Sequence, residues 1–518
     1  MRENGVTYNV YADPQGADRP WDLDMLPFMV SADEWRQIEA AVIQRAGLLD
    51  RILGDLYGEQ TLLREGLLPS ALVHGNSGFL RPAVRVPVPG DVRLHIYAAD
   101  LARSPDGRWW VVGDRTQAPS GMGYALENRL VISRLFPDLF RDLRVQRLAG
   151  FFAALRDGLT GWAPKGDGPP LIVQLTPGPF NVTYFEHAYL ARYLGFPLVE
   201  GSDLTAREGK VWLKTLSGLK RVHAIVRRLD DDYCDPLELR SDSALGIPGL
   251  MEAVREGQVL VANALGSNIL ESGALLGYLP RLAEHLLGEP LKMPSVATWW
   301  CGEPAAMAQV LERLDELTLR PVLWRPLKAS LERDPGALPR EERVRHLQAQ
   351  QMHYIAQEIF NLSHVPVVDA AEPRRLVPRA ATLRVFACAT PNGYVVMPGG
   401  LTRIAGSADS RAVSMQRGGG SKDTWVLSTG PVSGFTLLRD AATPADLVRT
   451  GVDLSSRVAE NLFWFGRYAE RCEATARLLR AALTRLVEQA SMSDEAASRS
   501  GWPALDRKST RLNSSHTD

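Results

Sequence analysis

Apolar residues recur at helical spacing near the beginning of the chain. Between residues 34 and 58 they fall on one broad face, and Gly58 follows at the position of a helix stop. The members of this face are Trp35, Ile38, Val42, Leu49, Ile52, Leu53 and Leu56. The pattern predicts an amphipathic helix that buries one side.

Two short apolar runs follow, VRLHIY at 92–97 and RWWVV at 108–112. The turn sequence SPDG separates them, which predicts a β-hairpin. We expect this hairpin to bring Asp100 and Asp114 to the same end of a sheet, and a helix to cover 124–134.

From about residue 171, short strand-like runs alternate with helix-like segments. The strand-like runs are LIVQL, PLVEG, VWLKT, VHAIVRR and VLVANAL, and the helix-like segments are YFEHAYLARYLG and GLMEAVREG. This alternation predicts an α/β domain with a largely parallel sheet. Residues 305–317 and 340–352 have helical patterns, and the short strands and glycine turns of 354–405 predict an α+β unit.

A heptad seam of apolar or small residues runs along the C-terminal part. Its members are Val458, Leu462, Phe465, Ala469, Cys472, Ala476, Leu479, Leu483 and Leu486. Steps of four and three residues predict a long helix that packs against other helices. We interpret 450–490 as the first helix of a truncated all-α domain and 491–518 as a disordered or non-native tail.

Composition narrows the class of protein. At 518 residues the chain is long enough for two to four compact units. Its 59 Lys and Arg against 60 Asp and Glu provide no global field for nucleic acid or an anionic membrane. The four cysteines form no CxxC pair, and neither an apolar leader nor a spanning apolar run is present. We therefore expect a soluble cytoplasmic protein that binds neither nucleic acid nor a membrane.

The first candidate site combines Asp100 with the segment GDRTQAPSG, residues 113–121. The carboxylates of Asp100 and Asp114 and the amide of Gln117 are oxygen ligands of the kind that Mg²⁺ accepts beside phosphate oxygens. In the alternative interpretation, Asp114 and Ser120 only shape a turn.

The second candidate is RRLDDDYCD, which follows the strand-like VHAIV directly. Ligands gather beyond the carboxyl ends of strands in open α/β sheets. Here Arg227 or Arg228 could take a substrate carboxylate, and the acids, Asp231 among them, could hold the rest of a zwitterionic substrate. A solvated charge run with internal salt bridges explains the same residues.

The third candidate lies late in the chain. YIAQE, residues 354–358, predicts a strand whose backbone could read an adenine edge while Glu358 meets ribose hydroxyls. MPGGLTRIAG and QRGGGSKDTW are glycine turns flanked by Arg403, Arg417 and Lys422, and such turns expose N–H groups that suit phosphate. A flexible hairpin turn is the alternative for each.

Taken together, these segments resemble one family. RENGVTYNVYADPQG, QRAGLLDRILGDLYG, PDGRWWVVGDRTQAPSGMGYALENR, YFEHAYLARYLGFPLVEGSDL, RRLDDDYCDPLELR, MPGGLTRIAG and GGGSKDTWVL resemble the type 2 circularly permuted ATP-grasp proteins. SRVAENLFWFGRYAER resembles the start of the α-helical domain often fused behind them, the alpha-E domain. The resemblance covers about residues 1–490.

The resemblance implies an α/β and α+β protein with an ATP-grasp fold in permuted order, in which ATP and Mg²⁺ lie between two subdomains. It also implies relatedness to glutathionylspermidine synthetase, which activates a carboxylate as an acylphosphate for attack by an amine. The substrates would be small-molecule or peptide carboxylates and amines. A protein partner or a second copy would bind through the C-terminal helical segment.

The resemblance further assigns roles and boundaries. It implies metal ligation by Asp100, Asp114 and Gln117, and catalytic roles for Arg384 and Arg403. The nucleotide would lie against Arg325, Tyr354, Gln357 and Glu358. We expect the N-terminal part of the ATP-grasp domain at 1–150, a substrate domain at 151–300, the nucleotide-binding subdomain at 301–440 and the start of the helical domain at 450–490.

Two departures from the family pattern favour a second hypothesis. Related enzymes carry a Glu and an Asn where this chain has Gly113, Asp114, Arg115 and Thr116, and the lid region 327–343 holds a single glycine, Gly336. A lid without glycines does not easily bring its backbone to phosphate. The alternative to a ligase is a non-catalytic nucleotide-binding or assembly subunit that works through its helical domain. A plain α/β sugar- or peptide-binding module is a third interpretation.

Overall fold

The computed structural model describes residues 1–9, 18–166, 168–322, 339–369, 374–407, 418–437 and 454–490, with the single residues 372, 413 and 415. Contacts divide the chain into two compact units. The first consists of Met1–Leu213 and Arg221–Asp446, and the second of Lys214–Lys220 and Leu447–Asp518.

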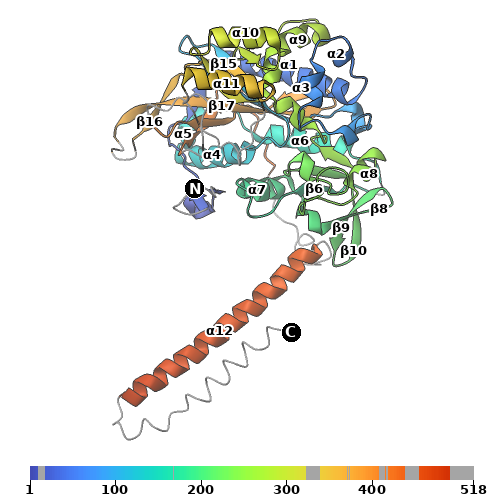
Figure 1. The fold of residues 1–518 in the computed structure, drawn as a ribbon. Coiled ribbons are helices and arrows are strands. Elements are labelled where there is room, and N and C mark those ends of the chain that lie inside the picture. The colour runs from blue at the N-terminus through green and yellow to red at the C-terminus, as the bar shows by residue number, and fades with distance from the viewer. Residues whose placement is uncertain are drawn as a thin grey trace. The chain divides into compact units, whose positions relative to one another are not determined.

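An eight-stranded sheet forms the centre of the first unit (Figure 1). Its strand order is β3 (Phe28–Val30), β20 (Gly420–Val426), β19 (Leu401–Ile404), β17 (Leu376–Thr390), β4 (Ile96–Arg103) and β5 (Trp109–Arg115). Two further strands, β16 (His364–Val368) and β18 (Gly393–Val396), pair with the long β17. All of these pairs are antiparallel except β3 with β20.

Helices cover both faces of this sheet. Side chains of a strand alternate between faces, and accordingly Leu383 and Val385 pack with helix α1 (Ala32–Tyr57), whereas Phe386 packs with α4 (Met122–Leu135) and α6 (Ala149–Trp162). Figure 1 shows α1 and α4 on opposite sides of β17. The predicted amphipathic helix is confirmed as α1, and the Ser31 hydroxyl caps it by accepting from the Glu34 N–H at 3.2 Å.

A four-stranded parallel sheet follows, in the order β12 (Leu260–Ala262), β11 (Ala224–Arg227), β6 (Ile172–Leu175) and β7 (Leu198–Val199). Helix α7 (Tyr184–Leu194) connects β6 to β7, and α8 (Leu250–Arg255) precedes β12. The predicted parallel α/β arrangement is confirmed. The run VWLKT is different: it forms β9 (Lys210–Thr215), which pairs antiparallel with β8 (Leu204–Arg207) and alternates buried with half-buried residues.

A three-stranded antiparallel sheet contains β13 (Thr298–Trp300), β15 (Tyr354–Glu358) and β14 (Leu317–Pro321), with β15 in the middle. Helices α10 (Pro304–Glu312) and α11 (Arg340–Gln350) belong to the same region, and Leu314, Leu347 and Ala356 lie in its small core. The remaining regular elements are β1 (Thr7–Asn9), β2 (Asp18–Pro20), α2 (Thr61–Arg64), α3 (Ser70–His74), α5 (Pro137–Asp142), β10 (Gly218–Val222) and α9 (Leu279–Leu287).

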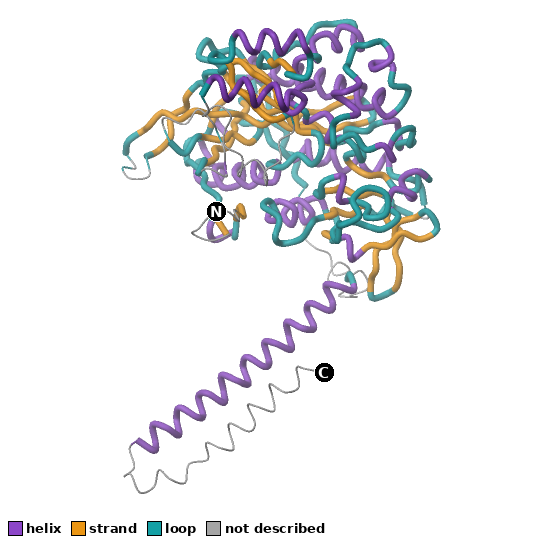
Figure 2. Tube along the Cα trace, viewed as in Figure 1, coloured by secondary structure: helices purple, strands orange, loops and turns teal. Residues whose placement is uncertain are grey.

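The second unit contains the long helix α12 (Ser456–Ala490), drawn as one unbroken coil in Figure 2. The Ser455 hydroxyl accepts from the Val458 N–H at 3.3 Å, as an N-cap does. The predicted long helix is confirmed, and its seam is exposed: Leu462, Phe465, Leu479, Leu483 and Leu486 all face solvent. Among the residues that the structure describes, no helix has both the length and the apolar character needed to cross a bilayer.

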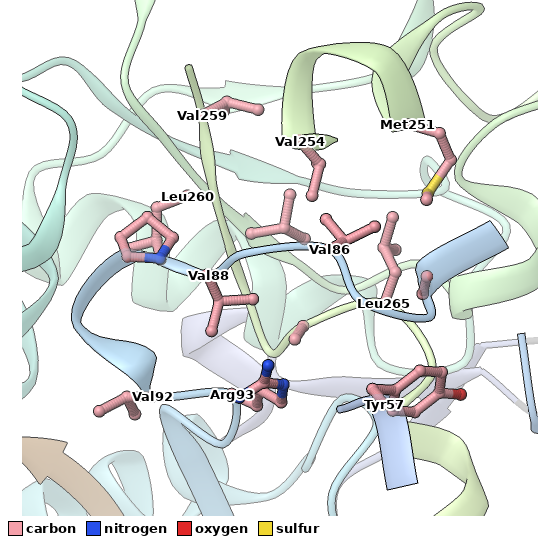
Figure 3. A pocket seen from close by; sticks show the side chains of 14 residues that line it. Tyr57, Val86, Val88, Val92, Arg93, Met251, Val254, Val259, Leu260 and Leu265 are labelled. Atoms are coloured by element: carbon pink, nitrogen blue, oxygen red, sulfur yellow. The ribbon is translucent and has the colours of Figure 1, made fainter. Parts of the chain in front are cut away.

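A small apolar hollow of about 30 Å³ lies in the first unit, next to Tyr57 (Figure 3). Val86 and Val88 line it from the segment after α3, and Met251, Val254 and Leu260 line it from α8 and β12. Its volume is of the order of one water molecule, so it is too small for a nucleotide or an amino acid.

We predict that Val86→Ile stabilises the protein by about 0.5–1 kcal/mol, because one more buried CH₂ fills the hollow without displacing a neighbour. Val173→Ile, on the closely packed β6, is the control and should be neutral or destabilising. Urea unfolding measures both, and a stability loss for Val86→Ile comparable with that of the control would contradict the prediction.

Candidate functional site

Four neighbouring strands bring four charged side chains to the α4 face of the large sheet. Asp100 on β4 lies directly opposite Arg384 on β17. Arg403 on β19 and Arg115 on β5 share that face, since they pair with Thr382 and Ala98, each two residues from the Arg384–Asp100 pair. The four therefore form a row across the sheet, with the carboxylate between arginines.

The two carboxylate oxygens of Asp100 accept four hydrogen bonds. Arg384 approaches side-on, with Nε 2.7 Å from Oδ1 and Nη2 2.9 Å from Oδ2. Arg403 donates from Nη2 to Oδ1 at 2.9 Å, and Arg115 from Nε to Oδ2 at 3.1 Å. We call these four residues the Asp100 cluster.

Charge dominates the protonation of the Asp100 cluster. Burial alone would raise the pKa of the Asp100 carboxyl, but Arg384, Arg403 and Arg115 outweigh burial and hold this pKa well below its usual value. Burial lowers the pKa of Arg403 to about 10, against the attraction of Asp100 and with the like charges of Arg384 and Arg115 adding to the effect. The cluster is thus crowded with positive charge around one ionised carboxylate.

Asp114 lies on the other face of the sheet. A β-bulge separates the pairs Leu101–Val111 and Asp100–Gly113, so that Asp114 pairs with Ala99. Its carboxylate accepts from Nε and Nη2 of Arg45 on α1, at 2.7 and 2.8 Å, and from the Tyr97 hydroxyl at 2.6 Å. Both charged side chains are 3% exposed.

The loop that links β5 to α4 is fixed by distant residues. The N–H groups of Thr116 and Gln117 both donate to Glu271 Oε1 at 2.8 Å, and Glu271 Oε2 lies 3.6 Å from Arg115. The Gln117 amide donates to Asp230 at 2.6 Å. Arg384 Nη1 donates to the carbonyl of Ser120 at 2.9 Å, which ties the end of the loop to the Asp100 cluster.

The N-terminus of α4 rests on a buried ion pair. Glu186 Oε1 accepts from the N–H groups of Gly121 and Gly123 at 2.7 and 2.9 Å, and Glu186 Oε2 lies 3.5 Å from Arg228. Gly121 has a φ of +117°, and a Cβ there would lie 2.9 Å from Leu401 Cδ2, so only glycine fits. Arg228 is predicted to bind a substrate carboxylate, and in the structure it forms an ion pair with Glu186.

Arg227 and Asp231 are also buried and internally bonded. Arg227 donates to the carbonyls of Asn263 and Leu229 at 2.8 and 3.0 Å and to the Ser267 hydroxyl at 2.8 Å. Asp231 lies 4.0 Å from Arg227 and accepts from the N–H of Gly266 at 3.1 Å. Burial raises the pKa of Asp231 to about 6, against the nearby Arg227 charge. These groups organise the end of β11, and their role toward a substrate stays a prediction.

The predicted adenine strand is present as β15, but its backbone is already paired. β14 pairs along all five of its residues and β13 along three of them. The Gln357 amide donates to Thr298 Oγ1 at 2.9 Å, and the Tyr354 hydroxyl lies 2.8 Å from His346 Nε2. Glu358 remains at the surface, 3.4 Å from Arg313. A base edge would therefore have to be read beyond Glu358.

Where the structure describes the two glycine turns, their glycines allow close packing of the backbone. A Cβ at Gly400 would lie 2.4 Å from the carbonyl oxygen of Arg384, so the turn needs glycine to approach β17. Lys422 is buried and bonds Asp24 at 2.8 Å. Arg325 and Arg417 lie outside the described residues, as does most of the 327–343 lid region.

The structure does not bring the three predicted metal ligands together. Asp100 and Asp114 face opposite sides of the sheet, both bonded to arginines, and the Gln117 amide turns to Asp230. No group of three or more His, Cys, Asp or Glu suited to a metal occurs in the part of the chain that the structure describes. Arg384 and Arg403, by contrast, do lie together. Metal ligation stays a prediction.

Comparison with known proteins identifies the family. Residues 27–405 match the circularly permuted ATP-grasp type 2 family. The chain belongs to this family. Residues 454–516 match a second family, described as a predicted alpha-helical domain with a conserved ER motif, and the Glu-Arg pair in that range is Glu470–Arg471 on α12. The match runs beyond residue 490, into the segment that we interpreted as a tail.

Relatives of this ATP-grasp chain are similar over most of its length. The uncharacterized protein sll0335 of Synechocystis sp. is 39% identical over 430 residues, covering 82% of this chain and 88% of the relative. The uncharacterized protein Rv2567 of Mycobacterium tuberculosis is 37% identical over 493 residues, covering 92% of this chain. The chain spans about half the length, 54%, of that mycobacterial relative.

A solved structure supports the fold assignment. A glutathione synthetase-like effector from Globodera pallida has a TM-score of 0.51 and 13% sequence identity, over 82% of this chain and 94% of the effector. At this identity the likeness concerns the fold. The expected ATP-grasp architecture in permuted order is confirmed.

Several residues that organise the Asp100 cluster and its surroundings were not among the candidates. The sequence marked Arg115 only as a departure from the family pattern. It predicted no site role for Arg45, Glu186 or Glu271. Their partners lie tens to hundreds of residues away in the chain, so no local spacing identifies them. For Arg115, strand alternation alone would place the side chain opposite Asp114, and only the bulge in β5 puts it on the face of Asp100.

We predict that Arg45→Met destabilises the ATP-grasp domain by about 3–5 kcal/mol, because it leaves the buried Asp114 carboxylate without its cation. Arg36→Met, on the same helix but paired with Asp33 at the surface, should cost less than about 1 kcal/mol. Chemical unfolding compares the two, and equal losses would show that the Arg45–Asp114 pair is not a structural anchor.

We predict a pH-dependent gain from Asp231→Asn. The folded pKa of about 6 lies above the ordinary value of 3.8, so the Asp231 contribution is full below pH 3.8 and is lost as the pH rises through 6. At about 1.4 kcal/mol per pKa unit, the wild type should lose about 3 kcal/mol relative to Asp231→Asn over this window.

Urea unfolding between pH 3.5 and 7.5 measures the difference. Asp138→Asn, at the surface of α5, controls for the loss of one charge. A constant offset between wild type and Asp231→Asn across the pH range would refute the raised pKa.

Proposed function

We propose that this chain is an ATP-dependent carboxylate–amine ligase that uses Mg²⁺ with its nucleotide. The observation that carries the proposal is the Asp100 cluster, three arginines converging on one face of the central sheet, in a chain of the ATP-grasp family. The glutathione synthetase-like fold of the G. pallida effector is consistent with this chemistry.

The chemistry has two steps. A substrate carboxylate oxygen attacks the terminal phosphorus of ATP, which forms an acylphosphate and releases ADP. An amine nitrogen then attacks the acyl carbon, the C–O bond to phosphate breaks, and the amine loses a proton as the amide forms. Both steps spread negative charge over oxygen atoms, which fixed guanidinium groups stabilise.

The residues of this chain divide this work. Arg384 and Arg403 neutralise the transferring phosphoryl group, and Ser120 orients Arg384 by accepting from its Nη1. Glu358 lies at the exposed end of β15, where its carboxylate is accessible to the ribose hydroxyls of a nucleotide. Asp100, Asp114 and Gln117 do not fit one magnesium ion, because they lie on opposite faces of the sheet and are bonded within the protein.

A non-catalytic assembly subunit is the second candidate. The observation that favours it is the exposed apolar seam of α12. In addition, Arg227 and Asp114 of the first unit are bonded within the fold and not turned to a ligand. In that case Mg·ATP binds without turnover or does not bind at all, and α12 docks on a partner.

We predict that ADP release responds to a suitable carboxylate and amine pair, and that Arg384→Gln lowers this turnover about 10²–10³-fold, the usual loss for one oxyanion donor. Arg141→Gln, a surface change on α5, should leave turnover unaltered. A panel of carboxylates and amines in a coupled ADP assay tests this.

If no pair raises ADP release above the Arg384→Gln level, the ligase proposal fails. Thermal unfolding with Mg·ATP then separates the alternatives, because a ligand at 100 times its Kd adds about 2.7 kcal/mol. Stabilisation without turnover supports the assembly subunit, and no stabilisation favours a module that binds another ligand.

A further inference from the structure

We propose that Arg115, Arg384 and Arg403 form an oxyanion-binding cradle, and that Asp100 is a positioning residue of this cradle and not a magnesium ligand. The inference deepens the proposed function, on which it rests for the identity of the anion: a phosphoryl group or a substrate carboxylate. The binding itself does not require turnover.

The hydrogen bonds of Asp100 leave no room for a metal. A carboxylate offers about four lone-pair sites. Arg384 occupies two of them, and Arg403 and Arg115 occupy one each, at 2.7–3.1 Å. Magnesium would have to displace a charge-assisted hydrogen bond and lie beside three guanidinium groups.

Positive charge is in excess at the cradle. Three guanidinium groups face the carboxylates of Asp100 and Glu271, the latter 3.6 Å from Arg115. One positive charge is therefore left without a partner among these residues. The side chain of Arg115 is 33% exposed, so the cradle is open to an anion from solvent.

Arg403 supplies an unused donor. Its Nε is buried and has no hydrogen-bond partner among the residues that the structure describes, although its Nη2 bonds Asp100. A buried N–H group without an acceptor is costly, and an oxyanion beside Arg403 would satisfy it. Guanidinium groups bind phosphate and carboxylate oxygens through paired N–H groups, which matches this free donor.

The opposite face shows what a purely structural arrangement looks like here. Arg45 and Asp114 form a one-to-one pair, both almost fully buried, with Tyr97 completing the carboxylate's bonds. Neutral pairing avoids the desolvation cost of an extra cation. Arg45 Nη1 is itself buried without a hydrogen-bond partner among the described residues, so a free donor alone does not mark a ligand site. The Asp100 cluster departs from this pattern in its excess of positive charge and in the exposure of Arg115.

The first test titrates inorganic phosphate into the full chain in metal-free buffer, with ³¹P NMR as the readout. Arg403→Gln should weaken phosphate binding at least tenfold, because it removes one cation and the free donor. The matched control Arg141→Gln removes the same charge from the surface and should bind like the wild type. Equal affinities for Arg403→Gln and Arg141→Gln, or no phosphate binding by the wild type, would overturn the cradle.

Competition identifies the source of the anion. If acetate displaces phosphate from the wild type but not the remaining phosphate from Arg403→Gln, the cradle binds a substrate carboxylate. Phosphate binding that acetate does not disturb assigns it to a phosphoryl group.

The second test separates positioning from metal ligation. Mn²⁺ binding, followed by EPR, should be the same within twofold in the wild type and Asp100→Asn, whereas a tenfold loss would make Asp100 a metal ligand. A melting curve checks that Asp100→Asn folds, and the Arg403→Gln titration decides the cradle if it does not. Phosphate binding without ligase turnover refutes the ligase proposal and leaves the cradle standing. Turnover unaffected by Arg403→Gln refutes the cradle and the role of Arg403 in catalysis, and leaves the ligase activity standing.

Discussion

The register between β4 and its two neighbours determines what the central sheet presents on each face. Asp100 pairs with Arg384 on β17, which places its carboxylate on the α4 face of the sheet. The bulge between β4 and β5 shifts the register of β5 by one residue. Because side chains alternate, one extra residue in β5 exchanges the faces of everything after it. Val112 is that extra residue. Without it, Asp114 would pair with Ala98 and share the face of Asp100.

The loop after β5 depends on the parallel sheet as much as on the strands that carry it. Asn263, at the end of β12, bonds both the N–H and the carbonyl of Ile96 and the carbonyl of Thr116. Glu271 holds the next two N–H groups, and Glu186 on α7 holds the start of α4. The central sheet positions the arginine row, and these contacts tie the adjoining loop to the parallel sheet. Such fixed donors are the preorganisation that an anion-binding site needs.

Much of the fold could be predicted from the sequence because it depends on local patterns. The period of the apolar residues predicts α1 and α12, and the strand–helix alternation predicts the parallel sheet. The prediction that VWLKT belongs to the parallel sheet was wrong. This run forms β9, whose alternation of buried and half-buried residues is that of an antiparallel strand. The structure brings Arg384 and Arg403 together at Asp100, and their catalytic role stays a prediction.

The site was harder to predict, because it depends on register and on distant partners. The hairpin indicated that Asp100 and Asp114 end at the same level, and the bulge that separates their faces has no signature in RWWVVGDR. The charged residues at Arg227 and Arg228 predicted a site that binds a substrate carboxylate. Each arginine is instead bonded within the fold, to carbonyls and to a Glu186 that lies about 40 residues earlier. Contacts of this kind follow from assembled tertiary structure and not from spacing.

The bulge also bears on one departure from the family pattern, the segment from Gly113 to Thr116. Two carboxylates and an amide on one face would attract a cation. In this chain the bulge moves Asp114 to the α1 face, where Arg45 neutralises it, and puts Arg115 on the face of Asp100. The sign of the charge on that face is thereby reversed. Three guanidinium groups around one saturated carboxylate suit an anion better than a cation, so the position of Arg115 is consistent with the proposed site for phosphoryl or carboxylate oxygens.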